Sequence, residues 1–460
     1  MTVDSLAATL ALIGIVILVS SLLSGAVERT GLPQVAIFLL LGAALGPSGL
    51  GLVNLTLESP TLEVIATLGL VLVLFTDAIG MDVGEVRLQR RLALAILGPG
   101  TLLPATLIAL AAWTLLDLSI PASAILGAAL ASTDPVLLRT LVRHSSMSPT
   151  ARVALRLESG INDVILLPVV VLSMLALETG GSGGETHLGR HIVGLFILGP
   201  ALGVAAGYIA ITLLDQVRKK VGVRRDYESL YALGVAFTAY AGAEAAGGSG
   251  FLAAFAAGLT VAALDVELCD CFLDYGEASA EMFLLLTFVA FGSSLIWSGV
   301  EVAGAGTLLF AAIALVVRTI VLWPVLSLAG LRGHDRWVIA FFGPRGLSSL
   351  LLVLLPVFAG VQGSQQLFAI TCLVVLLSVV LHGGGIALYL QHGRRAGRES
   401  GTAPPTATGT LSKIESRKPT APPAPSPGPG SEAVEEKITL DEVKALMAAG
   451  APLILGDVRT

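Results

Sequence analysis

The chain has 460 residues, of which 55% are hydrophobic and only 13% are charged, and its mean hydropathy is +0.87. A soluble protein of this length would carry roughly a quarter charged residues, so the composition excludes one large soluble domain. The net charge of −6 and the lack of a basic stripe with interleaved aromatic residues predict no nucleic-acid partner. Three cysteines without metal-ligand spacing predict neither a disulfide framework nor a metal, and no cofactor is expected.

Long apolar runs separated by short charged segments predict an all-α polytopic membrane protein embedded in a lipid bilayer. A helix needs about twenty apolar residues to cross the hydrocarbon core, and about thirteen runs approach that length. The first run lacks the basic flank and small-residue cleavage site of a signal peptide, so it is interpreted as a span. The expected spans are 6–23, 33–51, 61–80, 92–115, 122–142, 152–175, 191–214, 227–246, 250–264, 281–298, 304–330, 337–359 and 367–391.

Basic residues follow the odd-numbered spans, and only Arg190 follows an even-numbered one. Because loops rich in Lys and Arg stay in the cytoplasm, the N-terminus is predicted outside and the C-terminus inside a cell (inner) membrane. The cytoplasmic loop predicted at 265–281 is instead acidic; it is either a solvated loop or a negative mouth that concentrates cations. The basic residues that set this orientation are Arg29, Arg87, Arg90, Arg91, Arg139, Arg143, Arg152, Arg218, Lys219, Lys220, Arg224, Arg225, Arg332, Arg336, Arg394, Arg395 and Arg398.

The composition changes after the last span. Residues 1–393 form the predicted transmembrane domain, and residues 394–435 are a linker rich in Pro, Ser, Thr and Gly. Residues 436–460 read as a helical pattern followed by a short apolar strand that ends in Asp457-Val458-Arg459. This segment resembles the start of a rhodanese-like domain. It is too short to bury a core and lacks a cysteine-bearing loop, so an enzyme activity is not expected there.

Two carboxylates lie about a dozen residues inside apolar runs. Asp134 follows Ser132-Thr133, and Asp163 ends the next span's polar motif. With a rise of 1.5 Å per residue, both acids are expected roughly 18 Å deep, where an ionisable group usually marks an ion or proton path. Pro135 should break the first of these helices and free backbone carbonyls beside Asp134.

The second polar motif, Glu158-Ser159-Gly160-Ile161-Asn162-Asp163, places oxygen atoms on two neighbouring helix faces. Ser159 and Asp163 are four residues apart and share one face, while Glu158 and Asn162 share the next. A hydroxyl and a carboxylate stacked in this way suit a small hard cation. Asn162 can brace the broken fifth span without adding charge.

Two arginines are also predicted at depth. Arg318 lies within an apolar run, and Arg345 lies in Gly343-Pro344-Arg345-Gly346, which predicts a second broken helix. A buried arginine stays charged and needs a carboxylate partner, and Glu158 is the expected partner of Arg318. Two broken helices suggest an inverted repeat in which spans four to six are answered by spans eleven to thirteen.

These residues resemble the monovalent cation/proton antiporter family of sodium/proton exchangers. The similarity covers about residues 6–391, and Pro344 is a departure from the commonest residue at its position. It implies thirteen helices, with a dimerisation domain and a six-helix core that moves the ion, and usually a homodimer. The similar motifs are Ala131-Ser132-Thr133-Asp134-Pro135, Arg156 to Asp163, Ala243-Glu244 with Ser249 to Ala253, Arg318, Gly343-Pro344-Arg345-Gly346 and His382-Gly383.

The resemblance also implies roles for individual residues. Asp163 would alternately bind cation and proton, with Ser159 and the Thr133 carbonyl as ligands and with Asp134 assisting directly or through water. Asn162 would hold the crossing, whereas Glu158, Arg318 and Arg345 would support the site. An Asn-Asp pair, where a related family has Asp-Asp, implies electroneutral exchange of one cation for one proton.

The expected function is therefore Na+/H+ antiport by a secondary transporter, with Li+ or K+ as other possible substrates. A proton and a cation that compete for one carboxylate give antiport by alternating access, and low pH should inhibit it because Asp163 stays protonated. A K+/H+ antiporter and a cation-coupled solute symporter are the alternatives. A cation channel is disfavoured because the two broken helices argue against a continuous pore.

Overall fold

The computed structural model describes residues 34–81, 89–142, 147–178, 192–264, 266–331 and 333–386, with a few positions between 14 and 22. These residues belong to one unit, Met1–Gly401. Most of the first predicted span, the linker at 394–435 and the rhodanese-like segment at 436–460 lie outside the described residues.

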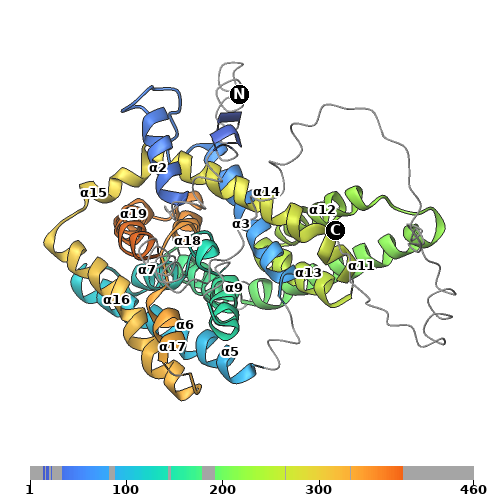
Figure 1. The fold of residues 1–460 in the computed structure, drawn as a ribbon. Helices are drawn as coiled ribbons and strands as arrows, with labels where there is room; N and C mark the ends of the chain where they lie inside the picture. Colours follow the sequence, from blue (N-terminus) through green and yellow to red (C-terminus); the bar gives the residue numbers. More distant parts are fainter. Residues whose placement is uncertain are drawn as a thin grey trace, which may run out of the picture. The chain divides into compact units, whose positions relative to one another are not determined.

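Every regular element in the described ranges is a helix (Figure 1). Two short π-helical segments, η1 and η3, begin and end longer helices. In chain order the elements are α2 (Gln34–Leu45), α3 (Pro60–Ile79), α5 (Arg90–Leu97), α6 (Pro99–Leu115), α7 (Ile120–Ala131), α8 (Pro135–Val142), α9 (Pro149–Glu178), η1 (Gly194–Leu198), α11 (Gly199–Lys220), α12 (Arg225–Ala245), α13 (Gly250–Leu264), α14 (Val266–Ser293), η2 (Leu295–Trp297), α15 (Ser298–Glu301), α16 (Ala305–Leu328), α17 (Gly333–Phe341), α18 (Leu347–Phe358), α19 (Ser364–Ser378) and η3 (Val379–Gly383).

The helices fit a membrane protein in length and composition. Within the described residues, six are long and apolar enough to cross a bilayer, and a seventh candidate bends by 59° between α14 and the η2–α15 segment. Four apolar helices in the described residues are shorter, with 10–17 residues each: α2, α7, α13 and α18. The predicted all-helical polytopic fold is confirmed, whereas the count of thirteen spans stays a prediction.

The acidic segment at 265–281 is not the loop that its charges predicted. From residue 266 it belongs to α14, which continues without a break to Ser293. At 1.5 Å per residue these 28 residues are about 42 Å long, more than the roughly 30 Å hydrocarbon core. The helix can therefore extend beyond the bilayer, where water can solvate its acidic side chains.

The helices pack in two groups that meet along α3. One group contains α2, α3, α11, α12, α13 and α14, and the other contains α5 to α9 and α16 to α19. Figure 1 shows α11, α12 and α13 on one side and α6, α16 and α17 on the other. Large apolar side chains are exposed on outer helices, such as Ile209 and Leu213 on α11 and Val316 and Ile320 on α16, where lipid would cover them.

Candidate functional site

The first broken helix is formed by α7 and α8. Helix α7 ends at Ala131, and Ser132 has an extended backbone with φ −63° and ψ 138°. Pro135 begins α8, where its missing N–H and fixed φ are tolerated, and it prevents α7 from continuing. The three residues between the halves, Ser132, Thr133 and Asp134, are each 0% exposed. Their backbone groups are therefore buried without a helical ladder.

The second broken helix crosses the first. Helix α17 ends at Phe341, and α18 begins at Leu347 after a non-helical segment that contains Pro344. The backbone N–H of Asp134 donates to the carbonyl of Pro344 at 2.9 Å. A backbone group in each break thus finds its hydrogen-bond partner in the other break, which fits the expected inverted repeat.

Each break carries a side chain that neutralises a helix end in the other. Asp134 Oδ2 accepts a hydrogen bond of 2.7 Å from the backbone of Leu347, the first residue of α18. Arg345 Nη1 donates to the carbonyls of Ala131 (2.8 Å) and Ser132 (3.0 Å) at the end of α7. A negative charge at a helix N-terminus and a positive charge at a C-terminus both oppose the helix dipole, so the crossing is electrostatically matched.

Arg345 differs from the sequence prediction in its partners. The prediction was a carboxylate partner, but the contacts of its Nη1 are carbonyls, and among the described residues its Nε and Nη2 have no hydrogen-bond partner. The side chain is 1% exposed. The partial negative charge at the end of α7 takes the place of a formal counter-ion.

Asp163 lies on α9 against this crossing and is 3% exposed. The hydroxyl of Ser132 donates a short hydrogen bond to Asp163 Oδ1. The hydroxyl of Ser348 on α18 is a second hydrogen-bond partner of the same carboxylate. Asp163 therefore contacts both broken helices through neutral hydroxyl groups.

Asn162 joins α9 to the first break. Its Nδ2 donates to Thr133 Oγ1 at 2.8 Å, and its Oδ1 has no hydrogen-bond partner among the described residues. Both residues are almost fully buried. The contact is the bracing interaction that the sequence led us to expect from Asn162.

Ser159, another predicted ligand, is hydrogen-bonded within its own helix. It is partly exposed, and its hydroxyl donates to the carbonyl of Arg156 on its own helix at 3.4 Å. Because a serine hydroxyl rotates freely, this weak bond does not remove it from the face of α9 that it shares with Asp163.

Glu158 and Arg318 form a buried ion pair with two parallel bonds. Arg318 Nε lies 2.7 Å from Glu158 Oε1, and Nη2 lies 2.5 Å from Oε2. Arg318 Nη1 also donates to the carbonyl of Ala340 at 2.8 Å, in the last turn of α17. The pair predicted from sequence is present, and it ties α9 to α16 and to the second broken helix.

Sequence reasoning missed the two serines that contact Asp163. Ser132 lies in the first motif and Ser348 lies two residues after the second, but helical periodicity does not extend across a break, so it could not place either side chain. A usable signal was present, since each hydroxyl lies within three residues of a Gly or Pro that interrupts a span. Polar residues beside such interruptions commonly face the site in transporters.

The oxygen atoms at the crossing suit a hard monovalent cation or a proton. They belong to carboxylates, hydroxyls, an amide and backbone carbonyls, which are the groups that bind hard cations. No cluster of three or more His, Cys, Asp or Glu side chains able to hold a metal occurs in the part of the chain that the structure describes. The arrangement offers one buried carboxylate that can exchange a proton for a cation.

Comparisons with known proteins identify the family of the chain. The family described as "Sodium/hydrogen exchanger, transmembrane" matches residues 15–392. The K+/H+ antiporter NhaP2 of Shewanella oneidensis is 26% identical over 381 residues, which are 80% of this chain and 64% of that protein. The K+/H+ antiporter NhaP of Alkalimonas amylolytica is 27% identical over 392 residues, which are 82% and 66% of the two chains. The chain thus spans slightly less than two thirds of the length of these relatives.

A solved structure has the same fold. The sodium proton antiporter MjNhaP1 of Methanocaldococcus jannaschii, determined at pH 8, superposes with a TM-score of 0.65 over 84% of this chain and 99% of its own. The sequence identity is 19%, so this likeness concerns the fold.

Proposed function

The chain belongs to the family of transmembrane sodium/hydrogen exchangers, and from this premise we propose that it exchanges a monovalent cation for a proton across a membrane. The observation that carries the proposal is the position of Asp163, a buried carboxylate held by neutral hydroxyls where two broken helices cross. A carboxylate without a formal counter-ion can bind either a proton or a cation. It cannot bind both, so each must leave before the other is bound.

In the proposed cycle, Asp163 loses its proton on one side and takes up a cation in its place. The Thr133 carbonyl, the hydroxyls of Ser159 and Ser132, and Asp134 complete the oxygen shell. Movement of the α5–α9 and α16–α19 group relative to the α2, α3 and α11–α14 group would then expose the loaded site to the other side. Because one cation replaces one proton, we propose that the exchange is electroneutral.

The transported cation is Na+ or K+. The resemblance of the motifs favours Na+, and the names of the K+/H+ antiporters that share 26–27% identity with this chain favour K+. Both ions bind the same kinds of oxygen ligand and differ in size and hydration, so the same residues suit either ion. We therefore include both in the test below.

We further propose that the protein is a homodimer in a cell membrane, with its N-terminus outside and its C-terminus inside. Support comes from the family resemblance and from the basic residues that follow odd-numbered spans. The segment at 436–460 is proposed to be part of a rhodanese-like domain.

Transport by purified protein in vesicles tests the function. Vesicles with an acidic interior are diluted into NaCl, KCl or LiCl, and an entrapped dye reports the rise of internal pH as protons leave. The wild type should alkalinise the lumen without any organic solute, and an imposed membrane potential should leave the initial rate unchanged. A requirement for an organic solute would indicate the symporter instead.

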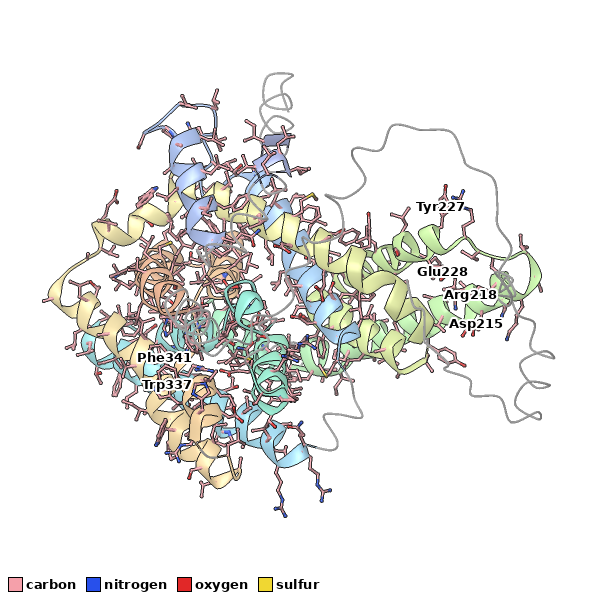
Figure 2. The ribbon with its side chains drawn as sticks, viewed as in Figure 1. Asp215, Arg218, Tyr227, Glu228, Trp337 and Phe341 are labelled. Atoms are coloured by element: carbon pink, nitrogen blue, oxygen red, sulfur yellow. The ribbon has the colours of Figure 1, made fainter. Side chains whose placement is uncertain are left out.

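The decisive variant is Asp163→Asn, which keeps the shape of the side chain and removes its charge. It should abolish exchange, and wild-type rates in this variant would refute the assignment of Asp163. Asp215→Asn is the matched control, because Asp215 is a half-exposed carboxylate on α11, on the opposite side from α7 and α18 in this view (Figure 2). It should exchange like the wild type.

A further inference from the structure

Two buried polar side chains on the last helix lie outside the oxygen shell proposed above. Ser378 ends α19 and is 0% exposed, and His382 lies in the π-helical segment η3 and is 3% exposed. A polar group buried in a span costs free energy unless it is hydrogen-bonded. Their hydrogen-bond partners therefore indicate what they do.

Ser378 connects this helix to the second break. Its Oγ accepts a hydrogen bond of 2.7 Å from the backbone N–H of Arg345 and lies 3.1 Å from His382 Nδ1. Arg345 lies in the non-helical segment between α17 and α18, so its N–H cannot join a helical ladder and needs an acceptor from elsewhere. Ser378 supplies that acceptor.

The bonding pattern assigns a role to the histidine as well. Ser378 Oγ can donate its own hydrogen or accept a second hydrogen bond, so His382 Nδ1 can pair with it in either role. His382 thereby fixes the orientation of the hydroxyl that holds Arg345.

His382 also contacts the other end of the break. Its ring lies 6.0 Å from the ring of Phe341, centroid to centroid, and Phe341 is the last residue of α17 (Figure 2). The end of α19 with η3 therefore touches the residue before the break and, through Ser378, a residue inside it. The π-helical turn changes the direction of side chains relative to an α-helix, and such turns are frequent at functional sites.

We propose that Ser378 and His382 are positioning residues that fix the second break so that Arg345 and Leu347 meet their partners on the first. The consequences reach Asp163 in a short chain of contacts. Arg345 Nη1 binds the carbonyl of Ser132, and the hydroxyl of Ser132 donates to Asp163. If the Arg345 backbone moved, the Ser132 hydroxyl would therefore move away from the Asp163 carboxylate. The expected effect on transport rests on the exchange function proposed above.

The first test compares three variants of α19 in the vesicle assay. Ser378→Ala leaves the buried N–H of Arg345 without an acceptor and should lower the maximal exchange rate per folded transporter by about tenfold. Ser378→Thr keeps the hydroxyl and should restore the rate to within about threefold of wild type. Thr371→Ala is the control, since the buried Thr371 hydroxyl donates to the carbonyl of Leu367 in its own helix, and this variant should behave like the wild type.

The second test separates the hydrogen bond from the ring. His382→Asn offers an amide that can donate to or accept from Ser378, whereas His382→Leu offers neither. His382→Leu should lower the exchange rate about as much as Ser378→Ala. The His382→Leu/Ser378→Ala double variant should be no slower than either single variant, because both changes remove the same interaction.

Amide hydrogen exchange of peptides covering 342–349 gives a readout that needs no transport. Hydrogen exchange of these amides should be about tenfold faster in Ser378→Ala and unchanged in Thr371→Ala. Unchanged hydrogen exchange and wild-type transport in Ser378→Ala would overturn the positioning role, as would a threonine variant no better than alanine. A wild type that exchanges no cation would overturn the proposed function instead, and the hydrogen-exchange result would still decide the role of Ser378.

Discussion

The ion pair between Glu158 and Arg318 should be a main determinant of stability in the α5–α9 and α16–α19 group. The perturbation is to remove one charge at a time with Glu158→Gln or Arg318→Met, and then both together. Each single change leaves a buried charge without its partner. Arg318→Met also removes the donor that reaches the Ala340 carbonyl.

The magnitude follows from the burial of the pair. The exposed fractions of the two side chains are 3% for Arg318 and 5% for Glu158, and both charges are bonded at 2.5–2.7 Å. Removal of one partner from a buried pair costs about 3–5 kcal/mol, because the remaining charge is left unsolvated. The double variant carries no net charge and should recover most of that loss, so the coupling energy should be at least about 2 kcal/mol.

The assay is the apparent free energy of unfolding from denaturant titration of the protein in detergent micelles. Glu228→Gln provides a comparison, because its 2.8 Å pair with Arg218 is more exposed, at 11% and 20% (Figure 2). It should cost clearly less than either change in the buried pair. Additive losses in the Glu158→Gln/Arg318→Met double variant, or single variants as stable as the wild type, would refute the reasoning.

Two further predictions concern the crossing. Gly346→Ala should abolish cation/proton exchange, because a Cβ at this residue would overlap the Asp134 carboxylate and displace it from the N-terminus of α18. Gly242→Ala on α12 is the control: a Cβ there meets open space, so the exchange rate in the vesicle assay should be unchanged. Asn162→Ala should lower the exchange rate by about tenfold, because Thr133 loses its 2.8 Å hydrogen-bond partner. Thr133→Val removes the same hydrogen bond from the other side, so the double variant should be no slower than the slower single variant. Additive losses of rate would argue against a shared interaction.

The sequence was sufficient to single out the charged residues near the crossing, but not the carbonyl partners of Arg345. Carboxylates and arginines inside apolar runs are energetically anomalous, so Asp134, Asp163, Glu158 and Arg318 could be identified by depth and by pairing rules. Pro135 and Pro344 predicted the two breaks because proline ends a helix for a steric reason. The contacts of Ser132, Ser348 and Ser378 were not predictable, since they depend on how two non-periodic segments cross.

The error at 265–281 has a different cause. Charge density was interpreted as a loop, but an amphiphilic helix can leave the bilayer and continue as a polar helix. Hydropathy therefore identified the apolar part of α14 but not the residue at which the helix begins.

The three buried carboxylates near the crossing differ in what neutralises them, and this difference argues for one exchange site. Glu158 is held by the guanidinium of Arg318, and Asp134 is held by the N-terminus of α18. Protonating either would break a contact that supports the fold. Asp163 is bonded by the neutral hydroxyls of Ser132 and Ser348, which can turn to accept from a protonated acid or donate to a charged one. It can therefore change its charge during a transport cycle while the two broken helices stay matched.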